Sequence, residues 1–330
     1  MMQQNILVIK LGALGDFIYA LGPMAAIRRH HPQDHITLLT TQPFAKMAQE
    51  CGYFDRILVD HKPKVFDIFG WVRLRSVLKE GRFSRVYDLQ NNDRTSLYFK
   101  LFGPPSARPE WVGAVKGASH RNASPERSQM HAFLGHRQTL TGAGIQNVEL
   151  DQLEWMKGDL SGCPLKVPYV VLVPGCSIAH PEKRWPVESF RVIISKLILQ
   201  GYQPVIIGSK EDQETNERVV RGIEGVLNLT ARTTLGDIPV LAKGAVAAIG
   251  NDTGPMHMAA VSGCPVVMLF CNQTSSIKMH APPKEKGLKA LEAMDLKEIS
   301  PQDVWTKFQE LLSENTNRSD TQLYPARADG

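Results

Sequence analysis

The stretch AVAAIGNDTGPMHMAAVSGCPVVMLF, Ala245–Phe270, decides the fold class of this chain. It begins with the apolar run AVAAIG and ends with PVVMLF, and both runs have the length and composition of strands that are buried on both faces. Between them lies a helical segment that Pro255 opens, since a proline loses nothing in the first turn of a helix. This order of strand, helix and strand is typical of a parallel sheet in an α/β protein.

The same alternation extends over most of the chain and predicts a doubly wound α/β fold. The region 104–146 differs, because it is rich in Gly, Ser and His and has few long apolar runs, and we expect loops around a single helix there. Strands, some with their following loop, are expected at 5–10, 35–41, 56–60, 85–89, 169–175, 204–209, 226–230, 245–250 and 265–270, and helices at 16–29, 43–51, 66–80, 130–141, 187–200, 211–221, 238–244 and 301–313.

The length of 330 residues suggests two domains of ordinary size. Pro164 and Pro168 mark the expected linker, so we assign residues 1–160 to the first domain and 161–315 to the second. Residues 316–330 hold too few apolar side chains to form a core, and we expect this tail to be disordered. Two α/β halves of similar size would leave a cleft between them.

The composition is that of a globular protein, with 43% hydrophobic and 22% charged residues. The longest apolar runs, such as PVVMLFC at 265–271, are far shorter than the roughly 18 residues that a membrane helix needs. MMQQNILVIK is not expected to be a signal peptide, because its apolar run is short and ends at Lys10. Five scattered cysteines without CxxC spacing favour reduced thiols over a zinc site. We therefore expect a cytoplasmic protein.

Positive charge is concentrated in the N-terminal half. Residues 1–155 hold 19 Lys and Arg against 14 Asp and Glu, a net charge of +5, whereas the rest of the chain holds 19 of each. Seven of the ten histidines also lie in residues 1–155. A solvated basic surface accounts for this pattern, and so does an acidic partner such as nucleic acid, an anionic lipid surface or an acidic substrate.

Three polar loops follow expected strands, at the carboxyl ends of the strands, where open α/β proteins bind ligands. The first is KLGALGDF, residues 10–17, whose two glycines let a ligand approach the backbone beside a helix N-terminus. Its spacing is not G-x-G-x-x-G, which disfavours an NAD-dependent dehydrogenase. Asp16 is either a carboxylate that faces a ligand or an ordinary N-cap of the helix.

The second loop is PGCSIAHPEKRWP, residues 174–186, which is rich in hydrogen-bond donors. Ser177, Lys183 and Arg184 suit a phosphate, although a surface loop with two solvated cations has the same composition. Trp185 argues against a floppy loop, because the dipeptide Trp-Pro should anchor the base of the following helix.

The third loop is GNDTG, residues 250–254. Thr253 or Asp252 serves as N-cap of the next helix, and the dipole and free N–H groups of that helix suit a diphosphate. The alternative is a well-capped buried helix without a ligand, but the loop holds more polar residues than capping requires. His257, one turn further on, is either a packed core histidine or part of the site.

In order and spacing, four motifs of this chain resemble glycosyltransferase family 9, the ADP-heptose:lipopolysaccharide heptosyltransferases. They are ILVIKLGALGDFIYALGPMAAIRRHHP at 6–32, YDLQNNDR at 87–94, PGCSIAHPEKRWP at 174–186 and GNDTGPMHMAAVSGCPVVMLF at 250–270. The resemblance covers about residues 5–312 and implies the GT-B fold, two Rossmann-like domains that face each other across a cleft. In this family the first domain binds the acceptor, the second binds the nucleotide-sugar donor, and the last helix usually crosses back to the first domain.

The resemblance also implies roles for individual residues. Asp16 matches the general base and Lys183 a ligand of the donor phosphates, so these two are the expected catalytic residues. A glutamate that reaches the nucleotide ribose matches Glu214, or Asp212 or Glu211 if the alignment slips. The other expected donor contacts are Ser177, Asn251, Asp252, Thr253, Gly254 and His257, and the expected acceptor contacts are Lys62, Lys64 and Arg94.

The implied reaction is an inverting transfer of a heptose, with ADP-heptose as the expected donor and a lipopolysaccharide inner core as the acceptor. One base takes the proton of the attacking hydroxyl, while a lysine and a helix N-terminus stabilise the leaving diphosphate, so that no metal or other cofactor is expected. The basic N-terminal half suits an acidic acceptor of the lipid A and Kdo type. Peripheral attachment to the cytoplasmic face of the inner membrane is expected, and a nucleic-acid partner is not.

Two alternatives stay open on sequence alone. A nucleotide-sugar epimerase of the same fold would need further acid and base residues around the sugar, and the sequence offers no clear cluster of them. A non-catalytic protein that binds a nucleotide sugar or a lipid would have no need of Asp16, Lys183 and Asp252 together.

Overall fold

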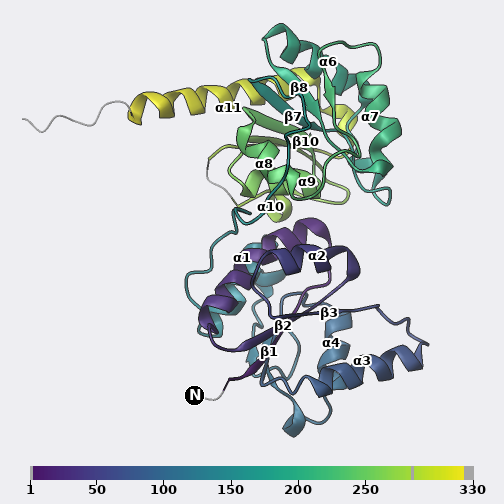
Figure 1. The fold of residues 1–330 in the computed structure, drawn as a ribbon, viewed down its shortest axis with the longest axis vertical. Coiled ribbons are helices and arrows are strands. Elements are labelled where there is room, and N and C mark those ends of the chain that lie inside the picture. Colours follow the sequence, from purple (N-terminus) through teal and green to yellow (C-terminus); the bar gives the residue numbers. More distant parts are fainter. Residues whose placement is uncertain (1–2, 284–285, 323–330) are drawn as a thin grey trace, which may run out of the picture. The chain divides into compact units, whose positions relative to one another are not determined.

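The computed structural model describes residues 3–283 and 286–322, with side chains described as far as residue 314. The chain divides into two compact units, Met1–Asp151 and Gln152–Gly330 (Figure 1). Each unit is built around a six-stranded sheet in which every pair of neighbouring strands is parallel. The predicted doubly wound α/β class is therefore confirmed.

The sheet of the N-terminal unit has the strand order β3-β2-β1-β4-β5-β6. In this order β1 lies beside β4 at the point where the sheet changes its direction of growth, and open α/β sheets bind ligands outside the carboxyl ends of the strands at such a point. The elements of this unit are β1 (Asn5–Ile9), α1 (Leu14–His30), β2 (His35–Thr40), α2 (Gln42–Glu50), β3 (Arg56–Val59), α3 (Ile68–Glu80), β4 (Arg85–Asp88), α4 (Asp93–Leu101), β5 (Glu110–Gly113), β6 (His120–Arg121) and α5 (Ala132–Gly142).

The strand β1 forms the centre of this unit because its apolar run is buried on both faces of the sheet. Ile6, Leu7, Val8 and Ile9 have no exposed surface. Each pairs with β2 on one side and with β4 on the other. A strand enclosed in this way must be apolar at every position, which is why NILVI shows no alternation of polar and apolar residues.

The region 104–146 contributes two strands that the sequence analysis assigned to loops. β5 pairs with β4, and β6 pairs with β5 at the edge of the sheet. Trp111 of β5 is fully buried, with its ring 5.1 Å from that of Phe99 and 5.9 Å from that of Phe102. The prediction failed because β5, with the sequence EWVG, has only two apolar residues before a glycine, and β6, with the sequence HR, has none, so neither strand forms an apolar run.

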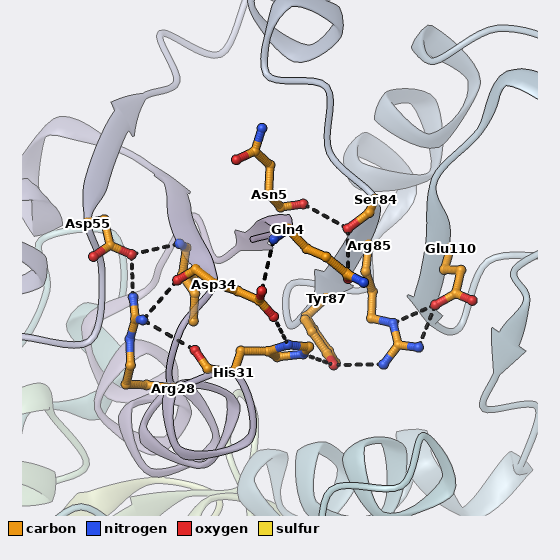
Figure 2. A network of polar contacts seen from close by, with 11 residues as sticks. Gln4, Asn5, Arg28, His31, Asp34, Asp55, Ser84, Arg85, Tyr87 and Glu110 are labelled. Atoms are coloured by element: carbon orange, nitrogen blue, oxygen red, sulfur yellow. Dashed lines mark hydrogen bonds and ion pairs between the residues drawn. The ribbon is translucent and has the colours of Figure 1, made fainter. Parts of the chain in front are cut away.

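A network of polar side chains closes the amino ends of the strands in this unit (Figure 2). His31 bridges Asp34 and Tyr87, with Nδ1 2.8 Å from Oδ2 of Asp34 and Nε2 2.8 Å from the Tyr87 hydroxyl. Arg85 pairs with Glu110 across β4 and β5 at 2.5 Å. These contacts fasten the edge of the sheet that lies opposite the expected ligand edge, so we assign them a structural role.

The C-terminal unit repeats the same architecture with the strand order β12-β11-β10-β7-β8-β9. Here β7 and β10 are the strands that meet at the switch point. The elements are β7 (Tyr169–Val173), α6 (Val187–Leu199), β8 (Gln203–Ile206), α7 (Gln213–Val220), β9 (Leu227–Asn228), α8 (Asp237–Gly244), β10 (Ala247–Asn251), α9 (Gly254–Val261), β11 (Val266–Cys271), α10 (Ile277–His280), β12 (Leu288–Ala293) and α11 (Pro301–Gln322).

Helix α11 packs on the core of the C-terminal unit through a stripe of apolar residues at helical spacing, Val304, Trp305, Phe308 and Leu311. The helix is longer than the predicted 301–313, since it continues to Gln322. The remainder of the expected disordered tail, 323–330, lies outside the described residues. Within the described part of the chain, no helix is both long and apolar enough to cross a membrane.

His136 on α5 makes the stability of the N-terminal unit depend on pH. It is buried, and its Nε2 has no hydrogen-bond partner among the described atoms. Burial lowers the pKa of His136 well below 6.5, and the charges of Lys10, His131 and Arg127 lower it further. Below about pH 6.5 the unfolded chain therefore binds a proton that the folded chain excludes, which lowers the free energy of unfolding by up to about 1.4 kcal/mol per pH unit.

We predict that His136→Gln removes this part of the pH dependence. Urea unfolding measured between about pH 7.5 and pH 5.5 should show a shallower loss of stability in the variant than in the wild type. His61→Gln is the matched control, because His61 is exposed. Equal slopes in His136→Gln and the wild type would contradict the assignment.

Candidate functional site

The switch point of the C-terminal unit brings two of the predicted polar loops together. Gly250 near the end of β10 pairs with Val173 at the end of β7, so the loops that follow these strands start side by side. The loop after β7 is 174–186, and the loop after β10 holds Asp252 and Thr253.

The side-chain amide of Asn251 joins these two loops. Asn251 is the last residue of β10 and has no exposed surface. Its Nδ2 donates to the carbonyl oxygen of Pro174 at 2.8 Å, and its Oδ1 accepts from the backbone N–H of Trp185 at 3.2 Å. Trp185 is anchored in turn, since its indole N–H donates to the carbonyl oxygen of Ile299 at 2.9 Å and its ring packs edge-on against Phe190. The loop 174–186 is therefore held at both ends, and the anchor at Trp185 is the one that its Trp-Pro pair predicted.

Asp252, directly after Asn251, binds two basic side chains. Its Oδ2 lies 2.8 Å from Nζ of Lys183, and its Oδ1 lies 2.9 Å from Nε2 of His257. Burial by itself raises the pKa of Asp252, but the hydrogen bonds and charges of His257 and Lys183 outweigh it, so that the pKa falls well below 3.8. Asp252 is thus a carboxylate at neutral pH, and it fixes the ammonium group of Lys183 at the carboxyl edge of the sheet.

The N-terminus of α9 opens beside this group. Thr253, one of the two residues predicted for this place, occupies the N-cap position, but its hydroxyl donates to the carbonyl oxygen of Asn251 at 3.3 Å and makes no capping hydrogen bond to the helix. Pro255 occupies the first turn, also as predicted. With no side-chain cap on the first turn and no side chain on Gly254, the positive end of the helix suits an anion.

The turn after β8 presents a carboxylate that the sequence analysis named only as an alternative. Asp212 is buried, and its Oδ2 accepts from the backbone N–H and the hydroxyl of Ser209 at 2.9 and 2.8 Å. Its Oδ1 has no partner among the described atoms. A Cβ atom on Gly175 would collide with this carboxylate, so the loop after β7 reaches it only because residue 175 is glycine. Glu214, by contrast, is exposed on α7.

Ser177 and Arg184 lie in the loop 174–186 with different surroundings. Ser177 is exposed, and its hydroxyl accepts from the backbone N–H of Ala179 at 3.3 Å. Arg184 is half-buried, and one of its Nη atoms donates to the carbonyl oxygen of Cys176 at 3.2 Å. Its Nε is buried without a partner among the described atoms. The loop thus holds one guanidinium with an unused donor, and the alternative of a surface loop with two solvated cations does not describe it.

The switch point of the N-terminal unit holds Asp16. The N-cap of α1 is Ala13, so the interpretation of Asp16 as N-cap is wrong: Asp16 lies within the first turn and is exposed. Lys10, at the end of β1, is buried, and burial lowers the pKa of its ammonium group while the charges of Asp16 and Asp88 raise it. The two carboxylates therefore act on one buried cation, which sequence reasoning missed.

The loop after β4 supports the loop after β1. Asp88, the last residue of β4, is buried and accepts from the backbone N–H groups of Gln90 and Asn91 at 3.0 and 2.8 Å. Gln90 in turn accepts from the backbone N–H of Leu11 at 2.9 Å. Burial raises the pKa of Asp88, against the effect of these bonds and of Lys10. The turn that carries Asp16 is thus fastened to the neighbouring strand end.

A basic cavity of about 610 Å³ opens beside the end of β4 and the start of α4. Four cations line it, Lys100, Arg108, Lys116 and Arg127. Asp88 and Asp93 line it as well. Three of the four cations come from the region 104–146, whose excess of Arg was visible in the sequence but could not be placed without β5 and β6.

The three expected acceptor residues gather around the loop after β3. The backbone N–H of Lys62 donates to Oδ1 of Asp60 at 2.7 Å, and the carbonyl oxygen of Lys64 accepts from the Trp71 indole at 3.0 Å. Arg94 donates to the carbonyl oxygen of Pro63 at 3.3 Å and lies over the Trp71 ring, 5.7 Å from its centroid. The structure therefore brings Arg94 of α4 to the loop that carries both lysines.

No group of three or more His, Cys, Asp or Glu side chains with the spacing of a metal site occurs among the described residues. The five cysteines are free thiols, of which all but Cys163 are buried.

Comparison with known proteins matches residues 71–299 of this chain to the family model of glycosyltransferase family 9 (heptosyltransferase). Among curated proteins, lipopolysaccharide heptosyltransferase 2 of Salmonella typhimurium is 24% identical over 290 residues, which cover 81% of this chain and 82% of that protein.

Solved structures resemble the chain over nearly its whole length. A glycosyltransferase family 9 protein from Veillonella parvula has a TM-score of 0.76 at 22% identity, covering 94% of this chain and 97% of that one. The ADP-heptose lipopolysaccharide heptosyltransferase II of E. coli has a TM-score of 0.71 at 20% identity, with 96% and 100% coverage. These similarities support the GT-B fold that the sequence motifs implied.

The Asn251 amide generates a prediction about stability. Asn251→Leu keeps the number and branching of the side-chain heavy atoms but leaves the N–H of Trp185 and the carbonyl oxygen of Pro174 without their partner. Each buried unpaired group costs about 1–3 kcal/mol, and chemical denaturation of the variant should show a loss of this order. Asn272→Leu is the control, because Asn272 is exposed. A loss no greater in Asn251→Leu than in Asn272→Leu would remove the role given to the amide.

Proposed function

This chain belongs to glycosyltransferase family 9 and is a glycosyltransferase, and we propose that it transfers a heptose from ADP-heptose to a lipopolysaccharide inner-core acceptor with inversion at the anomeric carbon. The observation that carries the proposal is the ion pair of Lys183 with Asp252 beside the N-terminus of α9. A fixed ammonium group next to the positive end of a helix suits the diphosphate of a nucleotide-sugar donor. The curated relative is a transferase, which favours transfer over the epimerase and binding-protein alternatives.

The donor site is proposed to lie at the switch point of the C-terminal unit. The phosphates are proposed to bind to Lys183, Ser177 and the first turn of α9 at Thr253 and Gly254. The residues proposed to hold this arrangement in place are Asn251, Asp252 and His257. The unpartnered Oδ1 of Asp212 is proposed to accept a hydrogen bond from a ribose hydroxyl. This assignment moves the role first given to Glu214 to a buried neighbour whose acceptor is unused.

Asp16 is proposed as the general base. It accepts the proton of the acceptor hydroxyl while the hydroxyl oxygen forms a bond to the anomeric carbon of the heptose. The bond from that carbon to the diphosphate oxygen breaks on the opposite face, and its electron pair leaves with ADP. Lys183 and the N-terminus of α9 stabilise the charge that develops on the leaving group, so the step as proposed needs no metal ion.

The acidic acceptor is proposed to bind to the N-terminal unit. Lys62, Lys64 and Arg94 supply three cations around one loop, and the cavity with Lys100, Arg108, Lys116 and Arg127 supplies four more. Phosphate and carboxylate groups of a lipid A and Kdo-type acceptor match this charge. Because that acceptor is a lipid, we also propose that the enzyme works in the cytoplasm and contacts the inner membrane peripherally.

The catalytic assignment predicts the effect of two substitutions. Lys183→Ala removes a fixed donor to the leaving group and should lower kcat by about 10²–10³-fold, and Asp16→Asn removes the base and should lower kcat by at least about 10²-fold. The assay incubates the enzyme with ADP-heptose and a deacylated Kdo–lipid A acceptor and detects the added heptose by mass. Adding EDTA should leave the wild-type rate unchanged. Transfer that persists in Asp16→Asn would exclude this residue as the base.

The donor assignment makes a second prediction, which separates Asp212 from Glu214. Asp212→Asn keeps the shape of the side chain but weakens the acceptor, and it should raise KM for ADP-heptose about tenfold with a smaller change in kcat. Glu214→Gln, at an exposed position on α7, should change neither. If Glu214→Gln raises KM and Asp212→Asn does not, the ribose contact belongs to Glu214.

A further inference from the structure

An exposed apolar segment lies between β3 and the middle of α3. The described residues include thirteen large hydrophobic side chains that are exposed, and five of them fall within residues 65–72. Phe66 is 94% exposed, Phe69 88% and Val65 80%, and Ile68 and Val72 are also exposed. The loop after β3 and the first turn of α3 lie at the rim of the N-terminal unit (Figure 1). Single exposed apolar side chains need no explanation, but a contiguous group of five indicates an interaction surface.

The segment is held firmly although its apolar side chains point outward. The Asp67 side chain caps α3 by accepting from the backbone N–H of Gly70 at 2.8 Å. The carbonyl oxygen of Lys64 accepts from the backbone N–H of Asp67 at 2.9 Å and from the Trp71 indole at 3.0 Å. Arg94 adds a bond to the carbonyl oxygen of Pro63. The five side chains are therefore displayed by an ordered scaffold.

Helix α3 carries apolar side chains on two of its faces. Leu74 and Leu78 are buried and attach the helix to its unit. Ile68, Phe69 and Val72 lie on the other side, since each is exposed. A surface helix of a globular protein normally presents polar side chains on its outer face. The outer face at the start of α3 is apolar instead, and no described residue covers it.

Basic residues surround the apolar group. Residues 61–79 contain five Lys and Arg and one acidic residue, Asp67, which gives a net charge of +4. All five cations, Lys62, Lys64, Arg73, Arg75 and Lys79, are exposed. Protein interfaces are depleted in lysine, whereas an apolar group framed by Lys and Arg is the arrangement that binds to anionic lipid surfaces.

We infer that residues 62–79 form a docking surface for an anionic lipid bilayer. The five exposed apolar side chains enter the boundary between headgroups and acyl chains. Arg73, Arg75 and Lys79, which have no part in the proposed acceptor site, contact the lipid phosphates. The apolar surface continues into a cavity of about 570 Å³, which Phe69 and Arg73 line together with Leu58 and Pro63. The inference deepens the proposed function and rests on it in one respect, because a lipid-anchored acceptor gives the enzyme a reason to bind membranes.

The test uses the full-length protein without donor or acceptor. It is sedimented with vesicles of phosphatidylcholine alone and with vesicles that also contain phosphatidylglycerol. The wild type should bind the anionic vesicles markedly more tightly, and the double variant Phe66→Asp, Ile68→Asp should lower that affinity by at least about tenfold. Arg75→Glu should lower it by about fivefold or more. Leu199→Asp is the matched control, because Leu199 is 83% exposed on α6, outside the surface, and its substitution should change nothing.

A second measurement separates this inference from the proposed function. The double variant should transfer heptose to the deacylated acceptor at the wild-type rate, since that acceptor needs no membrane. Equal binding of the wild type to both kinds of vesicle, or unchanged binding by the double variant, would overturn the docking surface. So would self-association of the wild type that the double variant abolishes, because a second copy of the chain would then cover these residues. Failure of the wild type to transfer heptose would instead refute the proposed function.

Discussion

The buried amide of Asn251 is the interaction on which the C-terminal site depends. It binds Pro174 at the start of the loop after β7 and Trp185 near its end, so both ends of that loop are tied to the end of β10. Lys183 lies two residues before the second attachment, and Asp252 directly follows the amide. One side chain thus positions both members of the ion pair. Because each unpaired buried partner would cost about 1–3 kcal/mol, an apolar residue cannot replace it without loss.

In the N-terminal unit, other residues support the loops at the switch point of the sheet. The two sheets share one strand order, and in each the fourth strand of the unit ends in a buried polar residue, Asp88 in β4 and Asn251 in β10. At a switch point the connections of two adjacent strands diverge, which leaves backbone groups without ladder partners. Asp88 binds the N–H groups of its own loop, and Gln90 then binds the N–H of Leu11. In both units a polar side chain at or just beyond the end of the fourth strand, Asn251 or Gln90, therefore supports the loop after the first strand.

The sequence predicted what depends on local pattern and missed what depends on contacts between distant segments. The apolar run of β1 and the polar loop before α9 were both visible, because burial on two faces and helix capping leave signals within a few residues. The strand β5 was missed, since its two apolar residues stand between a glutamate and a glycine and form no apolar run. The burial of Asp212 depends on Gly175, 37 positions earlier, and no local pattern separates it from Glu214. The exposed Phe66 and Ile68 were expected within an ordinary helix, whose apolar residues normally face the core.

The position of Asp252 requires an electrostatic explanation, since it carries the same sign of charge as the proposed diphosphate. Its two oxygen atoms are used by different partners, Oδ2 by Lys183 and Oδ1 by His257, and its side chain is only 4% exposed against 16% for Lys183. The carboxylate therefore lies behind the ammonium group, where its repulsion of an incoming anion is offset by two donors. Because of this ion pair, the long side chain of Lys183 is already ordered before a ligand arrives. Ligand binding therefore does not have to offset the entropy lost in ordering that side chain. A fixed donor of this kind acts most strongly on charge that develops during a reaction, because no rearrangement is needed when the leaving group departs.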